Sequence, residues 1–158
     1  MLLIALVGCA KKTTFPENGM PAIGVPIADM NTKLQILSPA GFNNTYKNND
    51  PLSLIVKVVT DDQVAFTPDF GARMFIYQNE KWEEVKNTEE YSQDMSQYTI
   101  YSNAKDNPFE DGDPILCPSI SNLPKTAPLR VIIIGNIYKD GKVTDTKTAG
   151  YIDLVLKP

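Results

Sequence analysis

Histidine is absent from the chain, and cysteine occurs only twice, as Cys9 and Cys117. Histidine is the commonest general base and the commonest ligand of transition metals. Its absence therefore excludes Ser-His-Asp and Cys-His catalysis in their usual forms. Two cysteines alone also provide too few ligands for a conventional zinc site. We expect neither an enzyme nor a bound cofactor.

Concentrated positive charge is also lacking. The chain has 15 Lys and Arg residues against 19 Asp and Glu residues, which gives a net charge of −4, and no segment gathers the basic ones. Nucleic-acid-binding proteins normally carry a basic stripe, and helices that lie on membranes carry a basic face. We therefore expect no nucleic-acid partner and no membrane-surface helix.

The composition that is present favours strands and turns. Twelve prolines and nine glycines occur in 158 residues, and both residue types interrupt helices and mark turns. The hydrophobic content of 42% is ordinary for a globular protein, so the chain can bury a core. Val, Ile, Thr and Tyr recur in runs, which is typical of strands.

From residue 32 onward, short apolar runs alternate with turn signals. In the run 52–59, every second residue is apolar, which predicts a strand with one buried face. Further strands are predicted at 33–37, 64–67, 73–77, 82–85, 98–101 and 115–117. The turn 78–81 makes the strands 73–77 and 82–85 hairpin partners. At most one or two helical turns are expected, at 87–95.

The last forty residues carry the clearest pattern. The run 129–138 is apolar on both faces over much of its length, as in a central strand. Asp140-Gly141 follows it and is a preferred hairpin turn, because both positions accept positive φ. In the closing strand, 149–156, Ile152, Leu154 and Leu156 are expected to point inward, and Tyr151, Asp153 and Val155 outward. Seven or eight strands in all predict an all-β, antiparallel sandwich spanning residues 32–158.

The segment 48–85 resembles the immunoglobulin-like modules of bacterial surface lipoproteins. In those modules a Tyr and an Asn/Asp turn lead into a long strand, and a later strand ends with an aromatic residue and a Trp. The residues that fill these places are Tyr46, Asn49, Asp50, Phe75, Tyr77 and Trp82. The resemblance implies an immunoglobulin-like fold and brings no functional residues with it.

The chain begins with an apolar run that ends at a cysteine. Leu6-Val7-Gly8-Cys9 resembles the lipobox of bacterial lipoproteins, in which a peptidase cleaves before the Cys and the thiol carries a diacylglycerol. The resemblance implies a signal segment at 1–8 and a lipid on Cys9. It also implies a membrane partner through that lipid, with the protein held on the extracytoplasmic side of the cell envelope.

The apolar run departs from a signal peptide in two ways. It has no basic residue after Met1, and it is short. We therefore expect the true start to lie upstream. The alternative is that residues 2–7 form a buried N-terminal strand and Cys9 is a core thiol.

Residues 9–31 are predicted to be a lipid anchor followed by a tether. Prolines, glycines and two lysines in this stretch favour an extended, poorly ordered chain. The alternative is an edge strand, because Ile23, Val25 and Ile27 alternate with other residues.

Two groups of residues are candidates for a site. The acidic residues Asp106, Glu110, Asp111 and Asp113 offer oxygen ligands for calcium, but their spacing does not match an EF-hand, and a solvated loop is the favoured reading.

The aromatic residues Trp82, Tyr77 and Tyr91 are a candidate binding surface. The alternative for Trp82 is the core, where a lone Trp of a sandwich more often lies. Cys117 is expected to pack as a small hydrophobe, or else to form a disulfide with Cys9.

These patterns predict a non-enzymatic binding or structural module that offers loops or an edge strand to a protein or glycan partner. The alternative function is a regulator that inserts the loop 89–114 into the cleft of an extracytoplasmic enzyme such as a protease.

Overall fold

The computed structural model describes residues 14–16, 19–39, 44–47, 52–85, 96–103 and 126–157, together with the backbone of 113–117. Most of these residues lie in β-strands, and the only helix among them is the 3-10 turn η1, Ile27–Asp29. The prediction of an all-β fold is confirmed.

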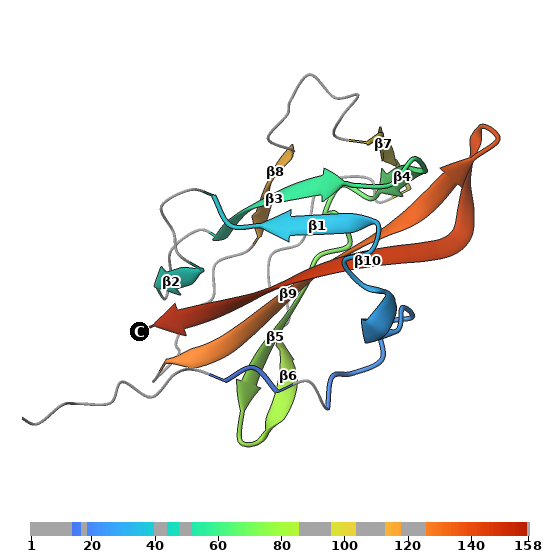
Figure 1. Ribbon diagram of the computed structural model, residues 1–158. Helices are drawn as coiled ribbons and strands as arrows, with labels where there is room; N and C mark the ends of the chain where they lie inside the picture. Colours follow the sequence, from blue (N-terminus) through green and yellow to red (C-terminus); the bar gives the residue numbers. More distant parts are fainter. Residues whose placement is uncertain are drawn as a thin grey trace, which may run out of the picture.

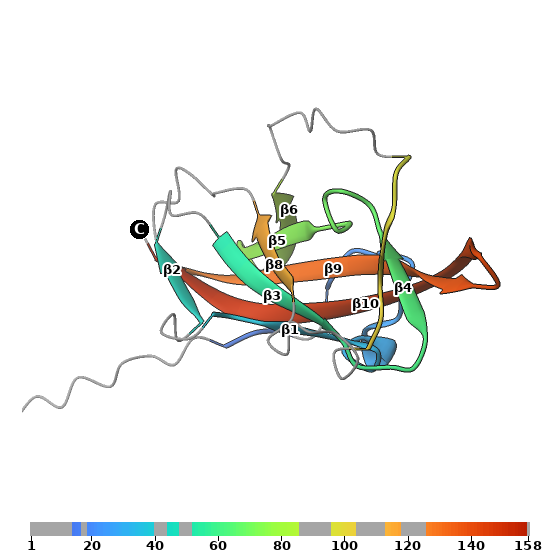
Figure 2. The same ribbon diagram turned by 90° about the horizontal axis from the view of Figure 1, so that it is seen from above.

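The strands form a small sheet and a large sheet that share one core (Figures 1 and 2). The small sheet has the order β1 (Leu34–Leu37), β3 (Leu52–Val58), β8 (Asp113–Cys117). The large sheet is built on β9 (Ala127–Lys139) and β10 (Lys142–Lys157), which pair along almost their whole length. Its other strands are β2 (Thr45–Lys47), β4 (Gln63–Phe66), β5 (Arg73–Gln78), β6 (Lys81–Val85) and β7 (Thr99–Tyr101).

The shared core follows the apolar alternation of the sequence. Leu52, Leu54, Val56 and Val58 of β3 are all buried against the large sheet, as their period of two predicts. Leu154 and Leu156 of β10 are buried in the same core, and Ile152 packs against it. The two predicted hairpins also form: Asp140 and Gly141 both have positive φ, and so do Asn79 and Glu80 between β5 and β6.

The prediction of a purely antiparallel sandwich is wrong for one pair of strands. β2 lies parallel to β10, with Tyr46 opposite Leu156, so the large sheet is mixed. Tyr46 is buried, and its hydroxyl donates a hydrogen bond to the carbonyl oxygen of Ser53 (2.7 Å). This short strand is held by the buried ring of Tyr46 and by pairing with a strand far away in the sequence. The polar, turn-rich residues around it therefore do not predict a strand.

Two strands share one edge of β9. β5 pairs with residues 129–132 of β9, and β4 pairs with residues 136–138. Between them the turn 67–72 passes close to β9, and the carbonyl oxygen of Phe70 accepts a hydrogen bond from the Ile134 amide (3.3 Å). Gly71 allows this approach: its φ is 55°, and a Cβ there would lie 2.5 Å from the Ile134 carbonyl oxygen.

The hairpin of β9 and β10 contains a wide bulge. β9 supplies one residue and β10 supplies three, 144–146, between the pairs Val143–Tyr138 and Lys147–Asn136. The side-chain amide of Asn136 donates to the Thr144 carbonyl oxygen (2.9 Å), and the Thr144 hydroxyl donates to the Ile137 carbonyl oxygen (2.7 Å). The bulge therefore moves the register of the rest of the hairpin by two residues and keeps each residue on its own face.

Residues 19–30 lie on the outer face of the large sheet, which is the face turned away from the small sheet (blue in Figure 1). Ile23 and Met30 are buried there. Asn31 then joins β10: its amide donates to the Ala149 carbonyl oxygen (3.0 Å), and its side-chain oxygen accepts from the Tyr151 amide (2.8 Å). Residues 19–31 are therefore packed on the sheet and do not form the extended, poorly ordered tether that was predicted. The alternative edge strand is not formed either, because Ile27 begins η1.

Candidate functional site

The structure brings together two of the three aromatic residues predicted to form a binding surface. Tyr77 of β5 faces Trp82 of β6 across the hairpin, and their rings meet edge to face with centroids 5.3 Å apart. Tyr91 lies outside the described residues. Trp82 is only 4% exposed, so it belongs to a buried cluster, as the alternative reading of the sequence expected.

Trp82 is buried beneath the N-terminal segment, defined as residues 14–16 and 19–30. Its indole N–H donates a hydrogen bond to the carbonyl oxygen of Pro16 (3.1 Å). Side chains of the segment complete a second hydrophobic cluster on the outer face. Its buried members are Ile23, Met30, Phe75, Trp82, Ile132 and Ala149. The outer face is therefore a second, smaller core between the large sheet and the N-terminal segment.

A buried arginine lies at the centre of this face. Arg130 of β9 is 2% exposed, and its Nε and Nη2 donate to the two carboxylate oxygens of Asp153 on β10 (2.6 and 2.8 Å). Its guanidinium carbon lies 5.0 Å from the Trp82 ring centre and 4.5 Å from that of Tyr151. Two aromatic rings and a carboxylate thus hold one desolvated cation.

The Arg130 guanidinium is incompletely satisfied. Its Nη1 atom is buried and has no hydrogen-bond partner among the described residues. A buried N–H group without an acceptor costs free energy, so Nη1 is a donor prepared for an oxygen that the described part of the chain does not supply.

A second arginine pair lies beside it on the same face. Arg73 donates from Nε and Nη2 to the two oxygens of Glu84 (2.7 and 2.8 Å), and its guanidinium carbon is 5.2 Å from the Phe75 ring centre. Donation of these hydrogen bonds to Glu84 raises the pKa of Arg73 above its ordinary value. The pair is more exposed than that of Arg130 and rims the buried cluster.

An open hollow of about 530 Å³ lies within the N-terminal segment. The residues that line it are Gly19–Ile27, Met30 and, from the large sheet, Ile132. The segment therefore covers the outer face but leaves this hollow between its own side chains and Ile132.

The other predicted site residues fall mostly outside the described part of the chain. This applies to Cys9, Asp106, Glu110 and Asp111. Asp113 and Cys117 lie at the two ends of β8, whose side chains are not described. Of the loop 89–114 proposed for enzyme inhibition, the structure describes residues 96–103 and the first two residues of β8.

The described residues contain no group of three or more acidic or cysteine side chains able to hold a metal ion. No described helix is long and apolar enough to cross a membrane.

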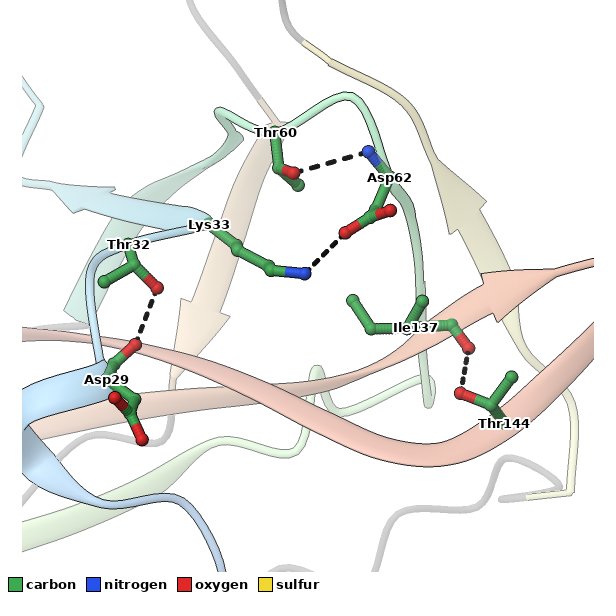
Figure 3. Close-up of polar contacts among 7 residues, drawn as sticks. All are labelled: Asp29, Thr32, Lys33, Thr60, Asp62, Ile137 and Thr144. Atoms are coloured by element: carbon green, nitrogen blue, oxygen red, sulfur yellow. Dashed lines mark hydrogen bonds and ion pairs between the residues drawn. The ribbon is translucent and has the colours of Figure 1, made fainter.

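A polar cluster lies where β1 and β4 begin (Figure 3). Lys33 of this cluster also lines a smaller hollow of about 160 Å³. The Lys33 ammonium pairs with the Asp62 carboxylate, and the Asp62 amide donates to the Thr60 hydroxyl (3.4 Å). Lys33 precedes β1 of the small sheet and Asp62 precedes β4 of the large sheet. The pair thus links the two sheets where the chain crosses between them. The hydrogen bond and the positive charge of Lys33 hold the pKa of Asp62 below its ordinary value.

Substituting Asp62→Asn is expected to lower the free energy of unfolding slightly at pH 7 and to have no effect near about pH 2. The ionised carboxylate stabilises the fold above its unfolded pKa of about 3.9, and this stabilisation is lost as the pH falls through the lower folded pKa. Urea unfolding of both chains at the two pH values measures the difference. Asp61→Asn is the control, since Asp61 is a neighbouring exposed carboxylate. A difference of equal size at both pH values would contradict the prediction.

Comparison of the chain with known protein families, with curated proteins and with solved structures gave no match.

Proposed function

We propose that the chain is a membrane-anchored, non-enzymatic binding or structural module of a bacterial cell envelope, with Cys9 as the site of lipid attachment. The observation that carries this proposal is the docking of Pro16 on Trp82, which fixes the chain shortly after the predicted anchor. Thr14, the first described residue, follows Cys9 by five positions, a distance that a fully extended chain spans in at most about 18 Å. A lipid on Cys9 would hold the sandwich close to the bilayer surface.

The arrangement of the two ends of the molecule supports this orientation. Residues 14–16 lie in the half that holds the C-terminal end of β10, and the tip of the β9–β10 hairpin projects at the opposite end (Figures 1 and 2). The tip residues Lys139–Lys142 are exposed. An anchor at the N-terminal side would turn this tip away from the membrane and toward partners.

The order of the strands supports an immunoglobulin-like topology as part of the proposal. Immunoglobulin constant domains place strands A, B, E and D in one sheet and C, F and G in the other. Here β1-β3-β8 would correspond to A-B-E, and β5-β9-β10 would correspond to C-F-G. β2 would then be an added parallel strand beside the last one.

The test is the intact mass and detergent partitioning of the protein expressed in bacteria from an extended upstream start. We expect cleavage before Cys9, a mass increase equal to the attached lipid, and partitioning into the detergent phase. Cys9→Ser is the matched control and should stay in water without lipid. An unmodified wild-type chain that remains in the aqueous phase would overturn the anchor.

A further inference from the structure

The N-terminal segment is held on the outer face by side-chain contacts and not by strand pairing. Among the described residues, no backbone–backbone hydrogen bond joins residues 14–28 to the large sheet, and the first such bond is that of Asn31 to Ala149. The contacts that remain are the indole hydrogen bond to Pro16 and the apolar side chains of the outer-face cluster. A segment held without a strand ladder is a separate unit of local stability. Its release would break no strand pairing among the described residues.

Two independent features show that this segment fits the face incompletely. The open hollow of about 530 Å³ lies within the segment instead of being filled by it. Arg130 Nη1, which lies on this face, is buried and has no acceptor within the described ranges of the chain. A ligand that displaced the segment and offered an oxygen to Nη1 would therefore make a contact that the described residues of the segment do not make.

The chemistry of the resident segment indicates what the face accepts. The segment carries Pro16, Pro21 and Pro26, and the carbonyl of the first accepts a hydrogen bond from Trp82. Aromatic-lined grooves with an indole N–H recognise extended, proline-containing chains, because such chains lose little conformational entropy on binding. The guanidinium of Arg130 adds a preference for an anionic oxygen beside the proline.

We propose that the outer face of the large sheet, formed by Trp82, Tyr77, Tyr151 and Arg130, is a binding site for an extended segment of a partner protein that carries a proline next to a carboxylate, and that the N-terminal segment occupies this site in the isolated chain. The inference rests on the binding-module part of the proposed function. It does not need a lipid on Cys9, so the peptide experiment and the mass measurement can fail separately.

The experiment uses the full chain and a fluorescent synthetic peptide with the sequence of residues 14–31, which contains Pro16 followed by Glu17. Ile23→Asp places a charge in the outer-face cluster and should loosen the resident segment. The apparent affinity for the peptide is the intrinsic affinity multiplied by the fraction of chains in which the N-terminal segment has left the site. The variant should therefore bind the peptide at least about tenfold more tightly than wild type, as measured by fluorescence anisotropy. Ile27→Asp is the matched control, since Ile27 lies in the same segment and is 39% exposed. It should bind as wild type does.

Two further measurements check the chemistry and the folding. A peptide with Pro16→Ala and Glu17→Gln should bind the Ile23→Asp chain about tenfold more weakly. The first change frees the φ angle that proline fixes, so more conformational entropy is lost on binding, and the second removes the carboxylate. Trp82 is the only tryptophan, so its emission should shift to the red in Ile23→Asp and return when the peptide binds. If Ile23→Asp fails to fold, Ile23→Ala is used in the same series.

Two results would overturn the proposal. The first is equal binding of the peptide by the Ile23 and Ile27 variants, or no binding by folded chains up to about 1 mM peptide. The second is a wild-type dimer in sedimentation that Ile23→Asp abolishes, which would assign the face to a second copy of the chain.

Discussion

Replacing Asp153 with asparagine is expected to lower the free energy of unfolding by about 3 kcal/mol. The loss comes from Arg130, which stays in place 2% exposed, with its positive charge no longer neutralised. The asparagine side chain can accept one hydrogen bond from the guanidinium but carries no charge. Urea unfolding at pH 7, followed by Trp82 fluorescence, measures the effect, since the Trp82 ring lies against the same guanidinium.

Two matched variants show whether burial is the cause. Glu84→Gln removes the carboxylate from the Arg73 pair, which has the same two-pronged geometry but side chains that are 31% and 40% exposed. That change should cost about 1 kcal/mol or less. The double variant Arg130→Met with Asp153→Asn removes both charges and should recover most of the loss of the single variant. Equal losses for Asp153→Asn and Glu84→Gln would show that Arg130 is not the desolvated cation described above.

The sequence predicted most of the strands, because these strands are marked locally. The alternation in β3, the apolar run of β9 and the Asp140-Gly141 turn are all readable from neighbouring residues. The parallel strand β2 was missed because its pairing with β10 joins segments more than a hundred residues apart. A three-residue strand has no period of its own to show this.

The outer face could not be predicted, because it depends on what covers the sheet. Tyr151 and Asp153 were expected to face solvent, and their side of β10 does turn away from the shared core. Proline and glycine in residues 19–30 indicate an extended backbone but give no sign of whether that backbone packs. The signal that could have been used is the spacing of Ile23 and Met30 within this polar stretch, together with a second apolar face on β9.

The Arg130–Asp153 pair was hidden by the bulge in the hairpin. A regular hairpin closed by Asp140-Gly141 would place Arg130 opposite Tyr151, and the two extra residues in β10 bring Asp153 to that position. The bulge is held by Asn136 and Thr144, neither of which marks a bulge in the sequence. Trp82 and Tyr77 were found from the sequence as neighbours across a hairpin, but the charge of Arg130 between the rings of Trp82 and Tyr151 was not.

Gly71→Ala is expected to destabilise the fold by about 3 kcal/mol, because it combines a strained φ with a contact that cannot relax. A Cβ at this position would lie 2.5 Å from the carbonyl oxygen of Ile134, which belongs to the backbone of the central strand. Moving the turn away would also break the hydrogen bond from the Ile134 amide to Phe70. The turn leads directly into β5, which carries Phe75 and Tyr77, so the outer face should be disturbed as well.

Comparison with Gly141→Ala separates the cost of positive φ from the cost of the steric contact with Ile134. Gly141 has a φ of 76° at the hairpin tip, and a Cβ there would meet nothing within 4 Å. This variant should therefore cost only about 1 kcal/mol, the penalty of a left-handed alanine. Both substitutions reduce the freedom of the unfolded chain equally, so the difference of about 2 kcal/mol between them isolates the contact with β9. Thermal and urea unfolding of the two variants measure it. Equal destabilisation would mean that the turn 67–72 does not approach β9 as closely as the shared strand edge requires.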